Sequence, residues 1–364
     1  MVQPSDRIPV SIITGFLGAG KSTLLNRLLR DPDMKDAAVI INEFGEVGID
    51  HLLVEASGDS MVELSNGCLC CTVRGELTDT LIYFREALAD GRIKALKRVV
   101  IETTGLADPA PVIQSIIGAT DISRDFSVDG VITLVDAVNG LSTLDNHEEA
   151  RRQAAVADRL ILTKQTMADA GMIAAITARL RKLNPGAPLI DGDTPEAAGY
   201  AMLSAGLYDP ATKIADVSRW LHDEGHHDHH HDDGDHHHHD EAIQSFSIVH
   251  DRPIDPAALG MFIDLLRSAH GEKLLRMKAV VHLTDNPDRP LVLHGVQSIF
   301  HQPERLAAWP DPTDRRTRMV LITKDLPAEF VQSLFDAFTG TPRIDQADRQ
   351  ALEENPLAIP GMRM

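Results

Sequence analysis

The sequence predicts an α/β fold: a doubly wound, mainly parallel sheet covered by helices, followed by a smaller α+β domain. From residue 8 to about residue 190, short apolar runs alternate with segments of helical period, which is the pattern of parallel strands joined by helices. A stretch rich in histidine and aspartate then separates this part from a second set of strands and helices. The chain has 364 residues, and 43% of them are hydrophobic, so it is long enough for two domains with real cores.

The first strand and helix enclose a glycine-rich loop. Ile8–Thr14 is a short apolar run, and Thr23–Arg30 carries leucines at helical spacing. Between them, Gly15–Ser22 matches G-x-x-x-x-G-K-[ST], the phosphate-binding P-loop of nucleoside triphosphatases. Its backbone N–H groups and the following helix N-terminus favour phosphate, Lys21 reaches the β- and γ-phosphates, and Ser22 holds Mg²⁺. The predicted nucleotide contacts in this loop are Gly15, Gly18, Ala19, Gly20, Lys21, Ser22 and Thr23.

Two later strands end in segments that suit a nucleotide site. The strand Ala37–Ile41 runs into Asn42–Asp50, which is either a segment that senses Mg²⁺ and the γ-phosphate or an ordinary acidic loop. The strand Arg98–Ile101 ends at Glu102, and an acid in this place is typical of the carboxylate on the Mg²⁺ side. Gly105 would bring its N–H to the γ-phosphate, whereas the plainer alternative is a strand end with a capping acid. Lys21 and Glu102 are the predicted catalytic residues.

All three cysteines lie in one short segment after a brief strand at Met61–Leu64. Cys68, Cys70 and Cys71 predict a thiolate site for Zn²⁺, Cu⁺ or Co²⁺ rather than a disulfide framework. Cys71 joins the other two only if the chain turns there, and a helix expected over Thr72–Asp90 would supply that turn. A fourth ligand must come from elsewhere: Glu46, Glu43, a histidine or a client protein. The alternative is three buried apolar cysteines.

The rest of the chain supplies further strands, a linker and the second domain. Gly130–Asp136 and Arg159–Thr163 are predicted strands, and the second of them leads into Thr163 and Lys164. His222–Asp240 contains almost no apolar residues, so we expect a disordered linker that binds Zn²⁺, Ni²⁺ or Co²⁺, or a plain solvated linker. The predicted boundaries are residues 1–215, a linker at 216–241, a second domain at 242–340 and a flexible tail at 341–364. Val296–Phe300 is one of the strands expected in the second domain. His282, His294 and His301 are expected to be ordinary polar residues and not ligands.

The charge and the apolar pattern exclude some partners. The formal net charge of −19 argues against nucleic acid and against an anionic membrane. No apolar run has the length of a membrane span, and no signal-peptide pattern precedes the first strand. We therefore expect a cytoplasmic protein, whose oligomeric state the sequence leaves open.

Four motifs, taken in order and spacing, resemble the CobW-type P-loop GTPases, which include zinc chaperones. They are Gly-Phe-Leu-Gly-Ala-Gly-Lys-Ser, Asn-Glu-Phe-Gly-Glu, Asn-Gly-Cys-Leu-Cys-Cys-Thr-Val and Glu-Thr-Thr-Gly-Leu-Ala-Asp-Pro. The resemblance extends to the His-rich linker and to a CobW-type C-terminal domain. It implies a GTPase that uses GTP and Mg²⁺ and binds Zn²⁺, or Co²⁺, at the three cysteines, with Glu46 as a supporting ligand or switch residue. It also implies delivery of the metal to a client metalloprotein under nucleotide control.

One motif departs from the family. The family usually carries Asn/Ser/Thr-Lys-x-Asp, whose aspartate pairs with guanine, but here Thr163 and Lys164 are followed by Thr166 in that place. A hydroxyl cannot accept two donors as a carboxylate does, which predicts weaker guanine selectivity unless Asp169 substitutes through a shifted loop. Two other functions compete: a metal buffer that uses the histidine tract, and a small-molecule kinase that uses the same P-loop.

Overall fold

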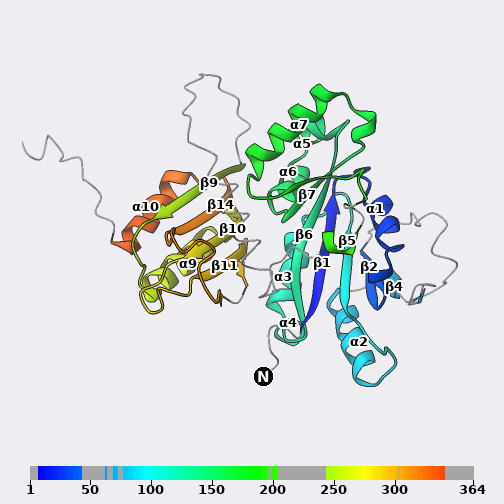
Figure 1. Ribbon diagram of the computed structural model, residues 1–364, viewed down its shortest axis with the longest axis horizontal. Helices are drawn as coiled ribbons and strands as arrows, with labels where there is room; N and C mark the ends of the chain where they lie inside the picture. Colours follow the sequence, from blue (N-terminus) through cyan, green and yellow to red (C-terminus); the bar gives the residue numbers. More distant parts are fainter. Residues whose placement is uncertain are drawn as a thin grey trace, which may run out of the picture.

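The computed structural model describes two β-sheets, each with its own helices (Figure 1). The described residues are 7–42, 62–63, 69–72, 77–195, 197, 199–203, 243–301 and 303–340, and for 62–63 and 69–72 only the backbone is described. The predicted linker and tail lie outside these residues. In the part of the chain that is described, no helix is both long and apolar enough to cross a membrane.

The first sheet contains eight strands in the order β3-β4-β2-β5-β1-β6-β7-β8. All its neighbouring strands are parallel except β3 and β4, which are antiparallel. The central strand β1 is flanked by β5 and β6, so the loops that follow these three strands lie together at one edge of the sheet. The strands are β1 Ile8–Gly15, β2 Ala37–Asn42, β3 Val62–Glu63, β4 Leu69–Thr72, β5 Arg98–Thr103, β6 Phe126–Asp136, β7 Arg159–Thr163 and β8 Leu189–Asp191.

Helices cover both faces of this sheet, because alternate strand residues point to opposite sides and both sides are apolar. Ile13 and Val39 pack with the leucines of α1, whereas Val10 and Ile12 pack on the opposite face with the other helices. The predicted doubly wound fold is thus confirmed. The helices are α1 Lys21–Leu28, α2 Leu77–Ala89, α3 Ala110–Gly118, α4 Thr120–Ser123, α5 Gly140–Asn146, α6 Glu148–Ala155 and α7 Ala170–Leu183, with short 3₁₀ turns at Pro32–Met34, Gln165–Met167 and Tyr200–Met202.

The second domain is an antiparallel sheet with two helices on one face. Its order is β12-β11-β10-β14-β9, and β13 also pairs with β11. Phe262 of α9 and Phe335 of α10 meet edge to face at 5.3 Å between ring centroids, in a core that they share with the strands. The elements are β9 Ile243–His250, α9 Pro256–His270, a 3₁₀ turn at Gly271–Lys273, β10 Leu274–Val281, β11 Leu291–Val296, β12 Ile299–Phe300, β13 Glu304–Arg305, β14 Thr317–Lys324 and α10 Ala328–Thr339.

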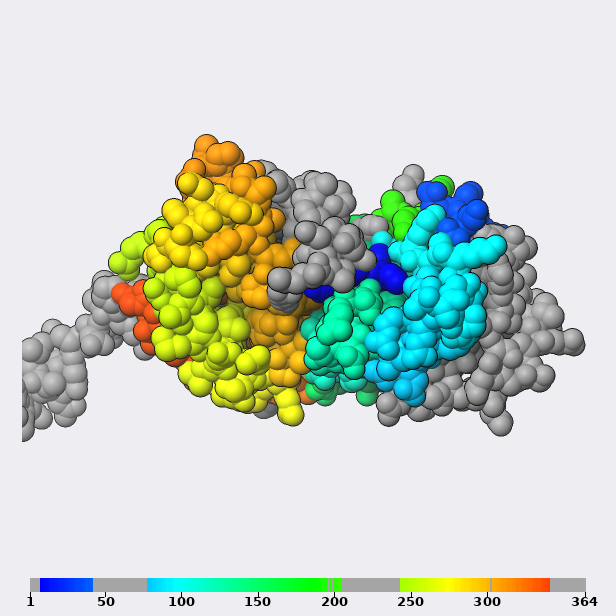
Figure 2. Space-filling view, turned by 90° about the horizontal axis from the view of Figure 1, so that it is seen from below, coloured from blue at the N-terminus to red at the C-terminus, as the bar shows by residue number. Residues whose placement is uncertain are grey.

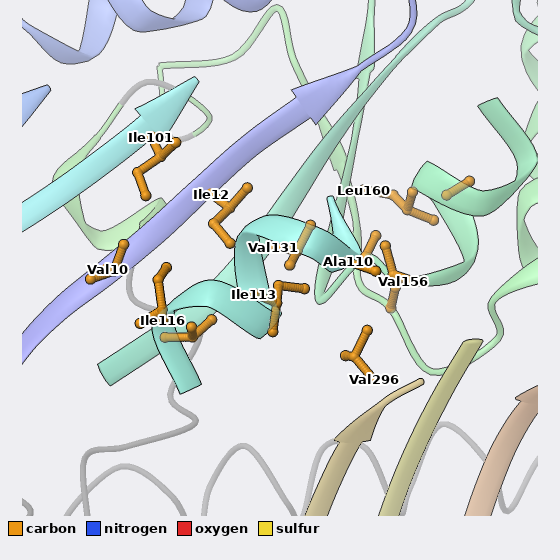
Figure 3. Close-up of a cluster of buried hydrophobic side chains, with 14 of the residues drawn as sticks. Val10, Ile12, Ile101, Ala110, Ile113, Ile116, Val131, Val156, Leu160 and Val296 are labelled. Carbon is orange, nitrogen blue, oxygen red and sulfur yellow. The ribbon is translucent and has the colours of Figure 1, made fainter. Parts of the chain in front are cut away.

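The opposite face of this second sheet packs against the first domain. Figure 2 shows the second domain, in yellow and orange, directly against the region around α3. At the contact, Val296 lies in one apolar cluster with Ala110, Ile113 and Val156 of the first domain (Figure 3). Arg276 of β10 also donates to the Val156 carbonyl and to the Asp158 carboxylate. The two domains therefore share a core and a buried ion pair.

Two local expectations were wrong. The chain does not turn at Cys71, because β4 continues through Thr72, which pairs with Ile41 of β2. The expected strand Val296–Phe300 is instead the end of β11, a turn and the short β12. Gln297 adopts a left-handed φ of 53° in that turn, which ends the extended backbone.

Candidate nucleotide site

The glycine-rich loop lies between β1 and α1 at the carboxyl edge of the first sheet. Gly15 has φ of 145°, and a Cβ atom there would lie 2.5 Å from the Leu134 carbonyl oxygen, so only glycine fits against β6. The helix α1 begins at Lys21 and has no acidic residue in its first turn. The N–H groups of its first turn and the loop backbone therefore suit an anion.

Lys21 is folded back across the loop. Its Nζ atom donates to the carbonyl oxygens of Gly15, at 2.9 Å, and of Phe16, at 3.3 Å. These bonds hold the ammonium group over the loop, where it can neutralise phosphate charge. The next residue, Ser22, donates its hydroxyl to Glu102 Oε1 at 3.2 Å.

The Ser22–Glu102 pair has the chemistry of a Mg²⁺ site. Both groups supply hard oxygen ligands, which Mg²⁺ prefers, and Glu102 is only 6% exposed beside the P-loop strand. β5 is parallel to β1, with Ile13 opposite Glu102, and Thr103 donates its hydroxyl to Thr14 at 2.8 Å. The carboxylate is therefore fixed relative to the loop, and the residues present fit the cation.

Gly105 brings the loop after β5 against the P-loop. A Cβ atom at Gly105 would lie 2.7 Å from the Leu17 backbone nitrogen, so any side chain here would force the two loops apart. Gln153 of α6, only 1% exposed, donates from its Nε2 atom to the carbonyl oxygens of Gly105 at 3.2 Å and Ala107 at 2.9 Å. The loop after β5 is thus held by α6 against the P-loop. Gln153 belongs to no motif, so the sequence pattern alone does not single it out.

Thr163 and Lys164 lie on the other side of the P-loop. The Thr163 hydroxyl donates to the Ala19 carbonyl at 2.8 Å, which ties the end of β7 to the loop. Lys164, with φ of 58°, donates from Nζ to Asp136 Oδ2 at 2.6 Å. Partial burial raises the pKa of Asp136, but hydrogen bonds from Lys164, Asn139 and two backbone amides outweigh it, so the pKa lies below its usual value.

A cavity of about 220 Å³ lies between the P-loop and the end of β6. Its lining includes Phe16, Gly18, Asp136, Asn139, Gln153 and Lys164. The sequence motifs do not include Asp136, Asn139 or Gln153 as nucleotide contacts. The position of Asp136 at the carboxyl end of an apolar strand, as with Glu102, was the one signal that could have found it.

Two family descriptions match the two domains in turn. Residues 9–191 match "CobW/HypB/UreG, nucleotide-binding domain" and residues 243–339 match "Cobalamin synthesis protein cobW C-terminal domain". The chain is 33% identical over 328 residues to the zinc chaperone YjiA of Escherichia coli, covering 90% of this chain and 98% of that protein. The chain belongs to the CobW family. It is therefore a GTPase with a P-loop.

Other members of the CobW family are similar over nearly their full length. The zinc chaperone CobW of Sinorhizobium is 32% identical, over 87% of this chain and 92% of that protein. The crystal structure of Zn(II)-bound YjiA GTPase from E. coli aligns with a TM-score of 0.66 and 30% identity, over 91% of this chain and 99% of that chain. The resemblance recognised from the four motifs is confirmed.

The loop after β7, which carries Thr163 to Thr166, departs from the CobW sequence pattern. Thr166 stands where the family usually has aspartate. The suggested substitute, Asp169, is used elsewhere: its carboxylate accepts from the Met172 N–H at 2.9 Å and caps α7. The cap holds Asp169 at the start of α7, and its substitution for the family aspartate stays a prediction.

The predicted metal motif lies mostly outside the described residues. Cys68 and Glu46 are outside them, and Cys70 and Cys71 are described only as backbone in β4, opposite Val39 and Ile40 of β2. Among the side chains that the structure describes, no three His, Cys, Asp or Glu residues come together as a metal site. The Zn²⁺ ligand set stays a prediction of the CobW motif.

Proposed function

We propose that this CobW-family GTPase captures Zn²⁺ at Cys68, Cys70 and Cys71 and delivers it to a client metalloprotein under the control of bound nucleotide. Glu46 is the supporting ligand or switch residue in this proposal, and Co²⁺ fits the same thiolates. The relatives named zinc chaperones support the choice of metal. The observation that carries nucleotide control is the set of contacts made by α6.

In the proposed nucleotide complex, the P-loop amides from Gly15 to Thr23 hold the phosphates and Lys21 neutralises their charge. Ser22 and Glu102 would hold Mg²⁺, which would neutralise charge on the transferring phosphoryl group. The Gly105 N–H contacts the γ-phosphate, and Thr163 and Lys164 support the base side. Water attacks the γ-phosphorus, the bond to the bridging oxygen breaks, and GDP and phosphate leave.

Helix α6 contacts the nucleotide loops along its length. At its start, the His147 ring lies 4.4 Å from the Phe16 ring of the P-loop. In its middle, Gln153 holds the Gly105 and Ala107 carbonyls. A change in the Gly105 loop on hydrolysis must therefore either move α6 or break these two buried hydrogen bonds, which is costly for buried carbonyl groups.

The same helix contacts the second domain. Lys324 of β14 pairs with Glu148 at the start of α6, and Glu148 pairs at 2.8 Å with Arg152, which reaches Asp108 in the Gly105 loop at 3.2 Å. The hydrogen bond from Lys324 is the main cause that lowers the pKa of Glu148. A line of charges thus runs from the second domain to the γ-phosphate loop, and a client held by the second domain would respond to hydrolysis.

The test is a Zn²⁺ and Co²⁺ competition titration on protein lacking residues 225–240, with Mg²⁺ and either GDP, a non-hydrolysable GTP analogue or no nucleotide. Thiolate-to-Co²⁺ absorption that strengthens with the analogue supports nucleotide-gated delivery, because a switch requires different metal affinities in its two states. Equal affinity in all three states refutes it. Loss of most metal capacity on removing the histidine tract favours a metal store instead.

Two variants separate the parts of the proposal. Replacing the three cysteines by serine should abolish the tight Co²⁺ signal while GTP hydrolysis continues. Lys324→Met should keep both the metal site and GTP binding but reduce the difference in metal affinity between GDP and the analogue. Arg267→Met, which removes an exposed pair with Asp264 on α9, is the matched control and should leave that difference unchanged.

A further inference from the structure

The loop after β8 lies beside the loop that carries the base-side motif. β7 and β8 are parallel, with Leu162 opposite Asp191, and the Gly192 N–H donates to the Leu162 carbonyl at 2.8 Å. A Cβ atom at Gly192 would lie 2.9 Å from that same carbonyl oxygen. The close approach brings the next residue, Asp193, beside Thr166, which stands where the family sequence has aspartate.

The Asp193 carboxylate bonds directly to the backbone of Thr166. The Thr166 N–H donates to Asp193 Oδ2 at 3.1 Å, although the two residues are 27 positions apart. Both residues are exposed. A carboxylate can accept about four hydrogen bonds, so capacity remains for two donors of a ligand.

Several contacts hold Asp193 in this position relative to the P-loop. Its own N–H donates to Asp191 Oδ1 at 2.9 Å. Arg27 of α1 donates to the carbonyl oxygens on either side, Gly192 and Thr194, at 2.6 Å each. Since α1 also begins at the P-loop lysine, the carboxylate and the phosphate site are built on the same helix.

We infer that Asp193 supplies the carboxylate that selects guanine in this protein, in place of residue 166. Guanine presents two donors on one edge, N1–H and the 2-amino group, and a carboxylate can accept both as charge-assisted bonds. Adenine presents a lone pair at N1, which a carboxylate repels. The inference rests on the P-loop as the nucleotide site of the proposed function and is independent of metal delivery.

The test uses the full chain, Mg²⁺, and the diphosphates of guanosine, adenosine and xanthosine in equilibrium binding. Asp193→Asn keeps an oxygen for the Thr166 N–H but turns an amide donor toward position 2 of the base. Xanthine has an oxygen there, whereas guanine has an amino group. The variant should lose GDP affinity by roughly tenfold to a hundredfold and gain xanthosine diphosphate affinity by a similar factor.

Second-site and control variants keep this test decisive. Thr166→Asp added to Asp193→Asn restores a carboxylate at the usual position and should recover the preference for GDP. Asp169→Asn, which changes the α7 cap in the same region, should retain that preference. The inference is overturned if Asp193→Asn still prefers GDP to xanthosine diphosphate, or if it loses all three nucleotides equally. The binding assay contains Mg²⁺ but no transition metal. A negative result for Asp193 therefore does not bear on metal delivery, which the Zn²⁺ and Co²⁺ titration tests separately.

Discussion

Replacing Arg276 by methionine should separate the stabilities of the two domains. Arg276 of β10 and Asp158 form an ion pair whose side chains are 6% and 4% exposed, and Arg276 also donates to the Val156 carbonyl. The variant leaves the carboxylate buried at the domain contact. The Asp158 carboxylate then keeps Lys278, whose Nζ is 3.1 Å away, and the Val131 N–H at 2.9 Å.

Two independent arguments give the size of the effect. Breaking one side of a buried ion pair costs about 3–5 kcal/mol, and the remaining Lys278 favours the lower end. Burial by itself raises the pKa of Asp158, but the charges of Arg276 and Lys278 lower it from 3.8 to about 2. A difference of that size corresponds to about 2 kcal/mol of stabilisation of the charged form. We therefore expect a loss of about 2–3 kcal/mol in the free energy of unfolding.

The assay is urea unfolding followed by tryptophan fluorescence and by far-ultraviolet circular dichroism, with Trp220→Phe in every protein so that Trp309 is the one remaining tryptophan. Trp309 is buried in the second domain beside Val280 and Val320, so its emission reports on that domain, whereas circular dichroism reports on both. The variant should lower the fluorescence midpoint by about 1 M urea or more and split the two transitions.

The matched control is again Arg267→Met, whose exposed pair contributes at most about 0.5 kcal/mol. Asp158→Asn combined with Arg276→Met removes both charges and should cost less than the sum of the single changes. A single Arg276→Met variant that unfolds within about 1 kcal/mol of the control would refute the reasoning, because a buried carboxylate that loses its arginine partner must cost more.

Three further predictions follow from single residues. Gln153→Leu should lower the rate of GTP hydrolysis about tenfold and change the GDP affinity little, because the variant releases the Gly105 loop. Assays of phosphate release and a GDP titration measure the two quantities. An equal loss of hydrolysis and of GDP affinity would contradict this prediction. Gly260→Ala lies at an exposed position of α9, where a Cβ atom meets nothing within 4 Å, and should raise the stability by about 0.5–1 kcal/mol in thermal melts. Gly271→Ala should lower the stability in the same melts, because its Cβ atom would lie 2.9 Å from the Ser298 side chain. Between about pH 4 and pH 2 the free energy of unfolding of the wild type should fall by about 2 kcal/mol as Asp158 is protonated, because the pKa of Asp158 is lower in the folded than in the unfolded state. Asp158→Asn should lack this loss when thermal melts are recorded across the same pH range.

The parts of the site that the sequence predicted are local in the chain. The P-loop follows the end of β1, Ser22 lies in the first turn of α1, and Glu102 and Gly105 lie at and just after the end of β5. Such positions are encoded by contiguous residues. Helical and strand periods likewise predicted a doubly wound sheet, because both faces of its strands are apolar. The turn at Cys71 failed for the opposite reason: pairing with β2 extends β4 through a residue whose local pattern favoured a helix.

By itself, the sequence determined the family, the GTPase chemistry, the fold class and the P-loop residues, since these follow from short motifs and from periodicity. The tertiary structure alone decided which distant side chains complete the site. Gln153 meets Gly105 across 48 positions, Asp193 meets Thr166 across 27, and Arg276 meets Asp158 across 118. None of these pairs shares a local pattern. Each contact depends on strand order and domain packing, which bring together residues that the backbone alone leaves far apart.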